Sequence, residues 1–436
     1  MDQRQLNEGL LAFLGASPTP FHAVKRMADE LTAQGFVRLH EKDDWALASG
    51  GRYFVTRNDS SIVAFQTGQG DVLANGLRLM GAHTDSPCLK VKPQPDINKL
   101  GFHQLGMEKY GGALLNPWFD RDLSMAGRVS YVNHAGQVCS ALIDFQRAIA
   151  TVPSLAIHLD RKANENRSIN VQTDMPVVVG LLSDNDNTTD FRALLLEQLQ
   201  QQDDNAAQVL DFEIYCYDTQ APALIGLREE FIASARLDNL LSCYVGLQAL
   251  INSDQALPTL LICTDHEEVG SASAAGAQGT FLNAVLERFC ANRIELTQLA
   301  AQSMMISVDN AHGIHPNFAD RHDNNHGPKI NEGPVIKINA SQRYASNSET
   351  SAIFRHLCQQ QNIPVQTFVV RSDMGCGSTI GPIAATETGI KTLDIGVPSF
   401  AMHSIRELAG AEDPYHLYAA LTAFCKQGQL SGGSCV

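Results

Sequence analysis

Hydrophobic residues in the first part of the chain recur at the spacing of an amphipathic helix. The first repeat is formed by Leu6, Leu10, Leu11 and Leu14. The run Ser17-Pro18-Thr19-Pro20 then interrupts the pattern, because proline disrupts a helix. The helical pattern resumes over residues 21–31. We therefore predict two helices within residues 1–35.

Short apolar runs typical of β-strands follow at residues 52–57, 61–68 and 77–85. From residue 96 the pattern changes, because glycine becomes frequent and the periodicity is mixed. This segment contains strand-like runs at residues 129–136, 137–145, 154–160 and 210–218, and one short helical run within residues 181–208.

Helical and strand patterns alternate from residue 233 onward. The pattern predicts helices at 237–250, 281–290, 349–361 and from Pro414, and strands at 259–265, 304–310, 335–339, 365–370 and 391–397. Such alternation is typical of an α/β domain with a mostly parallel sheet flanked by helices. We predict one such domain from residues 1–95 and 232–436, with a strand-rich second domain inserted at residues 96–231.

Composition narrows the range of partners. The 436 residues carry a formal net charge of −15, so nucleic acid and anionic membranes, which bind basic surfaces, are not expected partners. An acidic ligand would need a local positive group to hold it. No segment has the length of a membrane span or the pattern of a signal peptide, and the ten cysteines form no C-x-x-C pair. We expect a cytoplasmic protein with buried free thiols.

Side chains with metal-binding chemistry follow several of the apolar runs. These candidates are His83, Asp85, Glu267, Glu268, Asp309 and His403, together with Asp238 at the start of a predicted apolar helix. Ligands of an open parallel sheet bind beyond the carboxyl ends of its strands, so we expect the candidates to meet at one edge. Two histidines with several carboxylates suit Zn²⁺, with Mn²⁺ or Co²⁺ as substitutes. A metal-free acidic cleft is the alternative interpretation.

The spacing of these residues indicates which side chains would face the metal and which would face the substrate. Adjacent residues of an extended chain point in opposite directions, so one of Glu267 and Glu268 is expected to face substrate and the other metal. His83 and Asp85 share one side, where Asp85 can accept the second ring N–H of His83 and fix its tautomer. The sequence has no H-E-x-x-H, no phosphate-binding glycine loop and no G-x-S-x-G. These absences argue against zincins, Rossmann-type dehydrogenases and common serine hydrolases.

Longer motifs along nearly the whole chain are similar to those of the aspartyl aminopeptidase family. They are SPTPFHAV near the N-terminus, GAHTDSP (81–87), ARLDNL (235–240), DHEEVGS (265–271), DNAHGIHPN (309–317), GPVIKIN (333–339), QRYASN (342–347) and AMHSIRE (401–407). The resemblance implies an aminopeptidase that removes acidic residues from peptide N-termini and carries two zinc ions per subunit.

The resemblance also implies a role for each candidate, according to its position in these motifs. The metal ligands would be His83, Asp238, Glu268, Asp309 and His403, with Asp238 bridging the two ions. Glu267 would be the general base, and Asp85 would orient His83. Lys337 would receive the acidic side chain of the substrate, with His312 and Tyr344 as further substrate-binding residues.

His158 lies in the predicted inserted domain, and the resemblance leaves two roles for it. It is either a metal ligand or a substrate contact supplied to a neighbouring subunit. We favour the second role because two metals already have five ligands; a purely structural histidine is the third interpretation. The resemblance further implies a homo-oligomer, a dodecamer built from dimers through the inserted domain.

Two other functions would use similar residues. A metal-dependent carboxypeptidase or deacylase of the same fold would have a comparable ligand set but would accept substrates with a blocked N-terminus. A catalytically inactive binding relative would be free to lose Glu267 or a metal histidine, whereas this chain has both.

Overall fold

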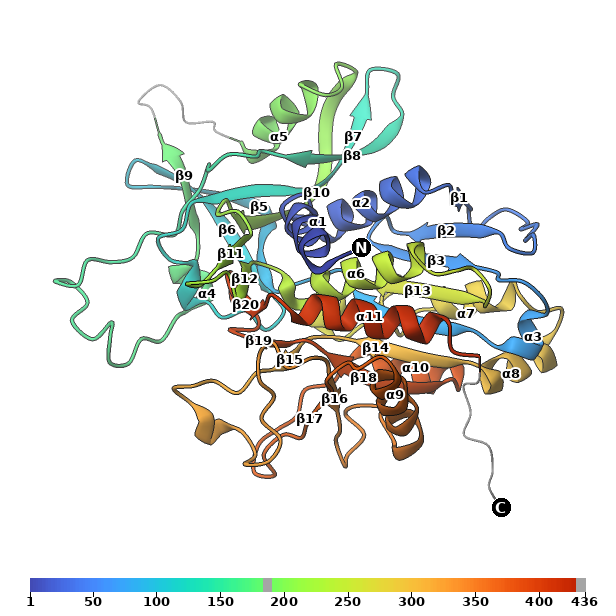
Figure 1. Cartoon of the computed structure of the whole chain (residues 1–436). Coiled ribbons are helices and arrows are strands. Elements are labelled where there is room, and N and C mark those ends of the chain that lie inside the picture. Colours follow the sequence, from blue (N-terminus) through green and yellow to red (C-terminus); the bar gives the residue numbers. More distant parts are fainter. Residues whose placement is uncertain (183–189, 429–436) are drawn as a thin grey trace. The chain divides into compact units, whose positions relative to one another are not determined.

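The computed structural model describes residues 1–182 and 190–428, which belong to two compact units (Figure 1). The first unit contains residues 1–85, 222–402 and the chain from Glu407 onward, and the second contains residues 86–221 and 403–406. The chain therefore divides after Asp85 and Ala221, whereas the sequence pattern placed the divisions after residues 95 and 231. The difference arises because strand pairing within the second unit already begins at Cys88.

A nine-stranded mixed sheet forms the centre of the first unit, in the order β1-β2-β3-β13-β4-β14-β18-β16-β17. Its strands are β1 Val37–Arg38, β2 Arg52–Arg57, β3 Ser61–Gln66, β4 Arg78–His83, β13 Thr259–Thr264, β14 Met304–Val308, β16 Val335–Lys337, β17 Gln366–Phe368 and β18 Lys391–Gly396. The run β13-β4-β14-β18 is parallel throughout. The predicted α/β fold with a mostly parallel sheet is confirmed.

Helices cover both faces of this sheet, because successive strand residues point to opposite sides. On β13, Leu261 and Cys263 join one hydrophobic core, while Leu260 and Ile262 join another. The first core also contains residues of α1 Gln3–Gly15, α2 Pro20–Ala33, α6 Leu237–Ile251, α9 Ser348–Gln360 and α11 Asp413–Cys425. The second contains residues of α3 Val72–Asn75, α7 Phe281–Glu287, α8 Arg293–Gln302 and α10 Ile380–Thr388.

Local sequence determines where the first helices begin. The carboxylate of Asp2 accepts the N–H of Gln5 at 2.8 Å, and the Gln5 side chain accepts the N–H of Asp2 at 3.0 Å, which forms a capping box for α1. Thr19 is the N-cap of α2, and Pro20 is its first residue. The two helices predicted at the N-terminus are therefore confirmed.

A second, five-stranded sheet in the first unit was not predicted. Its order is β11-β12-β20-β19-β15, formed by Ala223–Ile225, Phe231–Ser234, Glu407–Gly410, Pro398–Phe400 and Ala311–His312. Strands of two to four residues are too short to display a period of two in the sequence. Helix α8 was also missed, because it buries only Leu299 and Ala300 and therefore has little helical periodicity.

The second unit is built on a six-stranded antiparallel sheet in the order β8-β7-β10-β5-β6-β9. The strands are β5 Cys88–Lys99, β6 Phe102–Tyr110, β7 Leu123–Asn133, β8 Val138–Asp144, β9 Val177–Leu181 and β10 Ala206–Asp218, with helices α4 Val171–Asp174 and α5 Phe191–Gln200. The predicted strand at 154–160 is wrong. Its alternating residues Leu155, Ile157 and Leu159 are exposed, and the segment forms turns without a partner strand.

Within the residues that the structure describes, no helix combines the length and the apolar character needed to cross a membrane.

Candidate metal centre

Three neighbouring parallel strands end side by side in the nine-stranded sheet. His83 is the last residue of β4 and pairs with Thr264, the last residue of β13. Strand β14 ends at Val308, so Asp309 follows it directly. Parallel strands place their carboxyl ends at the same edge, which is why His83, the turn after β13 and Asp309 lie together.

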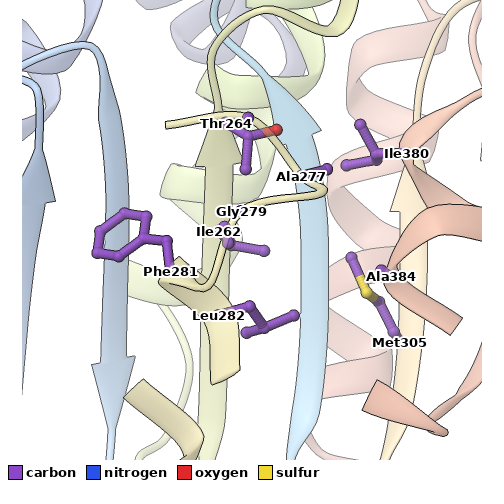
Figure 2. A pocket seen from close by; sticks show the side chains of 10 residues that line it. Ile262, Thr264, Ala277, Gly279, Phe281, Leu282, Met305, Ile380 and Ala384 are labelled. Atoms are coloured by element: carbon purple, nitrogen blue, oxygen red, sulfur yellow. The ribbon is translucent and has the colours of Figure 1, made fainter. Parts of the chain in front are cut away.

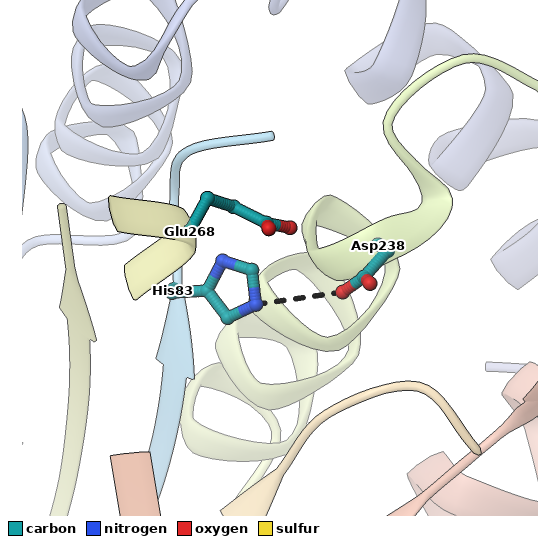
Figure 3. A group of neighbouring side chains, drawn as sticks. All are labelled: His83, Asp238 and Glu268. Atoms are coloured by element: carbon teal, nitrogen blue, oxygen red, sulfur yellow. Dashed lines mark ion pairs between the residues drawn. The ribbon is translucent and has the colours of Figure 1, made fainter. Parts of the chain in front are cut away.

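His83, Asp238 and Glu268 form a compact group at this edge (Figure 3). One potential ligand atom from each lies within 4.8 Å of the other two. Nε2 of His83 lies 3.4 Å from Oδ1 of Asp238 and 3.5 Å from Oδ1 of Asp309. Oε2 of Glu267 lies 4.0 Å from the same nitrogen. These predicted site residues therefore share one small volume.

Negative charge accumulates around His83. Burial alone would lower the pKa of His83, but hydrogen bonds to carboxylates, that of Asp238 foremost, raise it well above its ordinary value. Burial and the neighbouring carboxylates raise the pKa of Glu267 to about 7. The same causes raise the pKa of Glu268 well above its usual range. Carboxylates packed this closely repel one another, so a bound cation would stabilise the cluster.

His83 is oriented by Asp85. Nδ1 of His83 lies 3.0 Å from the main-chain oxygen of Asp85 and 3.4 Å from its Oδ1. The main-chain oxygen, rather than the carboxylate, is thus the nearer acceptor. Either contact leaves Nε2 directed at the carboxylates, as a metal-binding imidazole requires. An imidazole nitrogen among several carboxylate oxygens is a donor set that fits zinc.

The Asp85 carboxylate also fixes the turn that follows β13. It accepts the N–H groups of Glu267 at 3.1 Å and Glu268 at 3.0 Å. Both residues belong to the 3-10 turn Glu267–Val269, and His266 before it has a left-handed backbone with φ of 64°. The extended conformation predicted for Glu267 and Glu268 is therefore wrong. An extended strand would direct consecutive N–H groups to opposite sides, and one carboxylate could not accept both.

Asp238 lies at the start of α6, where the backbone departs from a helix. Asp238 and Asn239 have non-helical φ and ψ angles, and the peptide bond between them is cis. The N–H of Asp238 donates to Oε2 of Glu407 at 2.9 Å. The amide of Asn239 donates to the carbonyl oxygen of Val308 at 2.8 Å, beside Asp309. Glu407 was not among the site residues predicted from the sequence, although it is the last residue of the AMHSIRE motif.

A positive group borders the carboxylates on one side. Lys337, the last residue of β16, is only 2% exposed, and its Nζ lies 3.1 Å from Oδ2 of Asp309. The ring of Tyr344 lies 5.5 Å from the same ammonium group. Burial alone would raise the pKa of Asp309, but Lys337 and His83 hold it well below its usual range. Asp309 therefore links the histidine and the lysine electrostatically.

His312 ends the short strand β15, and its ring packs edge-on against Phe368 at 5.5 Å. Although part of this side chain reaches solvent, surrounding protein atoms and the Lys337 ammonium lower its pKa. The lowered pKa favours the neutral ring, which has one N–H to donate.

Two predicted site histidines belong to the second unit. Nδ1 of His403 lies 3.3 Å from the carbonyl oxygen of Gly112 within that unit. His158 is exposed, in the turn-forming segment between Leu155 and Leu159. The roles predicted for both residues remain predictions.

A separate cavity of about 20 Å³ lies between the sheet and helices α7 and α10 (Figure 2). Its lining is largely apolar and includes Ile262, Phe281, Leu282, Met305, Ile380 and Ala384. It has room for about one water molecule, and its apolar lining offers little chemistry for a substrate.

Comparison with known proteins identifies the family. Residues 13–425 match the sequence model of the aminopeptidase I zinc metalloprotease (M18) family. The chain belongs to the M18 family. A probable M18 family aminopeptidase 2 of Azotobacter vinelandii is 59% identical over 421 residues, which cover 96% of this chain and 98% of that protein.

Solved structures agree with this assignment. A chain of the Ape4 and Nbr1 complex is 38% identical and has a TM-score of 0.93, covering 97% of this chain and 86% of that one. The mApe1 dodecamer of S. cerevisiae is 26% identical with a TM-score of 0.82, covering 97% and 96%. This M18 protein is accordingly a metal-dependent aminopeptidase, a hydrolase of peptide bonds. The family favours this activity over the carboxypeptidase or deacylase alternatives.

Proposed function

We propose that this M18 aminopeptidase removes Asp and Glu from peptide N-termini and uses two zinc ions per subunit. The observation that carries the proposed specificity is the buried ammonium group of Lys337 beside the candidate metal centre. A lysine is rarely this buried unless its charge has a partner. Asp309 is that partner in the structure, and a substrate carboxylate would be a second one.

The net charge of −15 makes a local positive group necessary for an acidic substrate. Lys337 would form a charge-assisted hydrogen bond with the side chain of an N-terminal Asp or Glu. Tyr344 lies against the ammonium group and would keep it in place. A neutral substrate side chain would leave the lysine without this bond, so it would bind more weakly.

The residues that would hold zinc are His83, Asp238, Glu268, Asp309 and His403. Zinc at this site would lower the pKa of a water molecule and polarise the scissile carbonyl group. Mn²⁺ and Co²⁺ accept the same donors and would be substitutes.

Glu267 would act as the general base. Its Oε2 lies 4.0 Å from Nε2 of His83, so its carboxylate is within reach of a water molecule held at this centre. Glu267 would take a proton from the attacking water and deliver it to the leaving amine. His312 would donate a ring N–H to the developing oxyanion. Asp85 would keep both His83 and the Glu267 turn in position through the contacts described above.

We also propose a homo-oligomer, as in the S. cerevisiae mApe1 dodecamer, with the domain formed around residues 96–231 as the contact region. His158 would reach a neighbouring subunit's substrate, because it lies exposed in a segment with exposed Leu155 and Leu159. The partners would be peptides with an acidic N-terminus, without nucleic acid or membranes, in the cytoplasm.

A panel of N-terminal Asp, Glu, Leu and Ala anilides, assayed with and without a chelator, tests this proposal. We expect the acidic substrates to be cleaved fastest and the chelator to abolish activity until zinc is returned. Lys337→Ala should lower kcat/KM for acidic substrates by about 10- to 100-fold and change neutral substrates far less. Equal losses for all four substrates would contradict the role of Lys337.

A further inference from the structure

Asp394 is a fully buried carboxylate in the middle of an apolar strand. Strand β18 places it between Leu393 and Ile395, which are both core residues. Burial raises the pKa of Asp394. A carboxylate in such surroundings is destabilising unless several donors bind it, so its donors indicate what it holds together.

Two segments that are separate in sequence supply these donors. Oδ2 of Asp394 accepts the N–H of Ala345 at 2.6 Å, and Oδ1 accepts the hydroxyl of Thr379 at 2.7 Å. The N–H of Asp394 donates to Oγ of Ser346 at 3.0 Å. Asp394 therefore ties two segments to β18, which are residues 342–347 and the segment that ends at Thr379.

The first turn of α10 also lies against this carboxylate. Thr379 is the N-cap residue of α10, but its hydroxyl binds Asp394 instead of the helix backbone. A Cβ atom on Gly381 would lie 2.3 Å from each carboxylate oxygen, so a side chain at that position would collide with Asp394. The start of α10 is therefore packed tightly against the Asp394 carboxylate.

The two tied segments enclose Tyr344. The residue that donates to Asp394 from the first segment directly follows Tyr344. In the second segment, Cys376 packs in the same small hydrophobic cluster as Tyr344, and Ser378 Oγ donates to the carbonyl oxygen of Arg343 at 3.2 Å. The Tyr344 ring in turn lies against the Lys337 ammonium group.

We propose that Asp394 is a positioning residue for substrate specificity, which fixes Tyr344 over Lys337 by tying both segments to β18. The inference rests on the proposed preference for acidic N-termini. Asp394 acts through Ala345 and Thr379 and has no part in the bond cleavage itself. Loss of its contacts would let Tyr344 shift and the ammonium group lose its fixed place.

Asp394→Asn and Thr379→Val test this directly. Thr379→Val removes the hydroxyl that donates to Asp394, and Asp394→Asn replaces its charge-assisted hydrogen bonds with weaker neutral ones. Both substitutions nearly conserve side-chain volume. We expect KM for an N-terminal Asp anilide to rise by a factor between about 10 and 100, with kcat/KM for the Leu anilide within about threefold of wild type. Thr379→Ser retains the hydroxyl donor and should restore the wild-type preference. Zinc content and the circular dichroism spectrum should match wild type in all three variants.

These measurements separate the role of Asp394 from the proposed substrate specificity. If wild type prefers Asp over Leu and folded Asp394→Asn and Thr379→Val keep that ratio, the role of Asp394 is overturned while the proposed specificity stands. Parallel losses for both substrates would also overturn it, because they indicate a general structural role. If wild type shows no acidic preference, the proposed specificity fails, and the inference fails with it. Should Asp394→Asn not fold, the comparison of Thr379→Val with Thr379→Ser decides alone.

Discussion

The main-chain N–H of Asp238 donates a 2.9 Å hydrogen bond to Oε2 of Glu407, although 169 residues separate them in sequence. Glu407 is buried at the start of β20. The bond fixes the non-helical backbone at the start of α6, and hence the direction of the Asp238 carboxylate toward His83. A residue outside the predicted ligand set thereby contributes to the geometry of the metal centre.

Replacement of Glu407 should therefore affect metal binding. Glu407→Ala removes the acceptor, so we expect zinc affinity to fall by about 10- to 100-fold, as for other residues that orient ligands. Glu407→Gln retains an acceptor oxygen and should stay much closer to wild type. Zinc titration followed by atomic absorption measures both. Equal affinity in Glu407→Ala and wild type would contradict the role of this hydrogen bond.

Glu267→Gln separates proton transfer from metal binding. The amide cannot take a proton from water, so kcat should fall by at least about 100-fold. Zinc content should remain unchanged, because Glu268 rather than Glu267 belongs to the group with His83 and Asp238. Glu268→Gln is the matched control and should lose zinc as well as activity. Substantial turnover in Glu267→Gln would remove it as the general base.

His158→Ala tests the proposed contact with a neighbouring subunit. If His158 binds substrate across subunits, KM should rise by about tenfold, with zinc content unchanged. A fall in zinc content would favour the metal-ligand role instead. His134→Ala is a matched control, because His134 is also an exposed histidine of the second unit and should behave as wild type. If His158→Ala has wild-type kinetics and zinc content, the interpretation of His158 as a purely structural histidine is the one that stands.

Asp413 should make stability depend on pH. Its carboxylate accepts the N–H groups of Asn331 at 2.7 Å and Gly333 at 3.0 Å, but burial raises its pKa to about 7 from an ordinary value of 3.8. Between these pH values the native state retains a proton that the unfolded chain has lost. The contribution of Asp413 to the free energy of unfolding therefore falls as pH rises from about 4 to about 7 and is constant above that.

Asp413→Asn removes this titration. We expect the free energy of unfolding to fall between pH 5 and pH 8 by at least about 1 kcal/mol more in wild type than in the variant. Urea denaturation at one fixed protein concentration measures it, because oligomer stability depends on concentration. Parallel pH profiles for the two proteins would contradict the raised pKa.

Regular elements with strong periodicity were predictable from the sequence. The leucines at helical spacing in residues 1–35 and the apolar runs of β3, β4, β13 and β14 were identified correctly. The helices bury one face, which gives a periodic pattern, and these strands are buried on both faces, which gives continuous apolar runs. The alternating residues Leu155, Ile157 and Leu159 misled the same reasoning. Alternation shows that a segment could form a strand, whereas a strand forms only if a partner supplies its hydrogen bonds.

The proximity of His83, Glu268 and Asp309 was likewise predictable, because each lies at or just after the carboxyl end of a strand in the parallel part of the sheet. The conformation of Glu267 and Glu268 was not. It depends on the carboxylate of Asp85, which is distant in sequence and accepts both of their N–H groups. The pattern of hydrophobic and polar residues along the chain does not reveal a contact between residues so far apart in sequence.

By itself, the sequence determined the fold class, the family and the chemical types of the side chains at the site, since these depend on local periodicity and on residue identity. The tertiary structure alone decided how those side chains are held. Glu407 binding the backbone of Asp238 and Asp394 tying two loops to β18 are contacts between distant segments. Such contacts form only when the whole sheet is assembled, because the donors to these buried carboxylates come from segments that are distant in sequence.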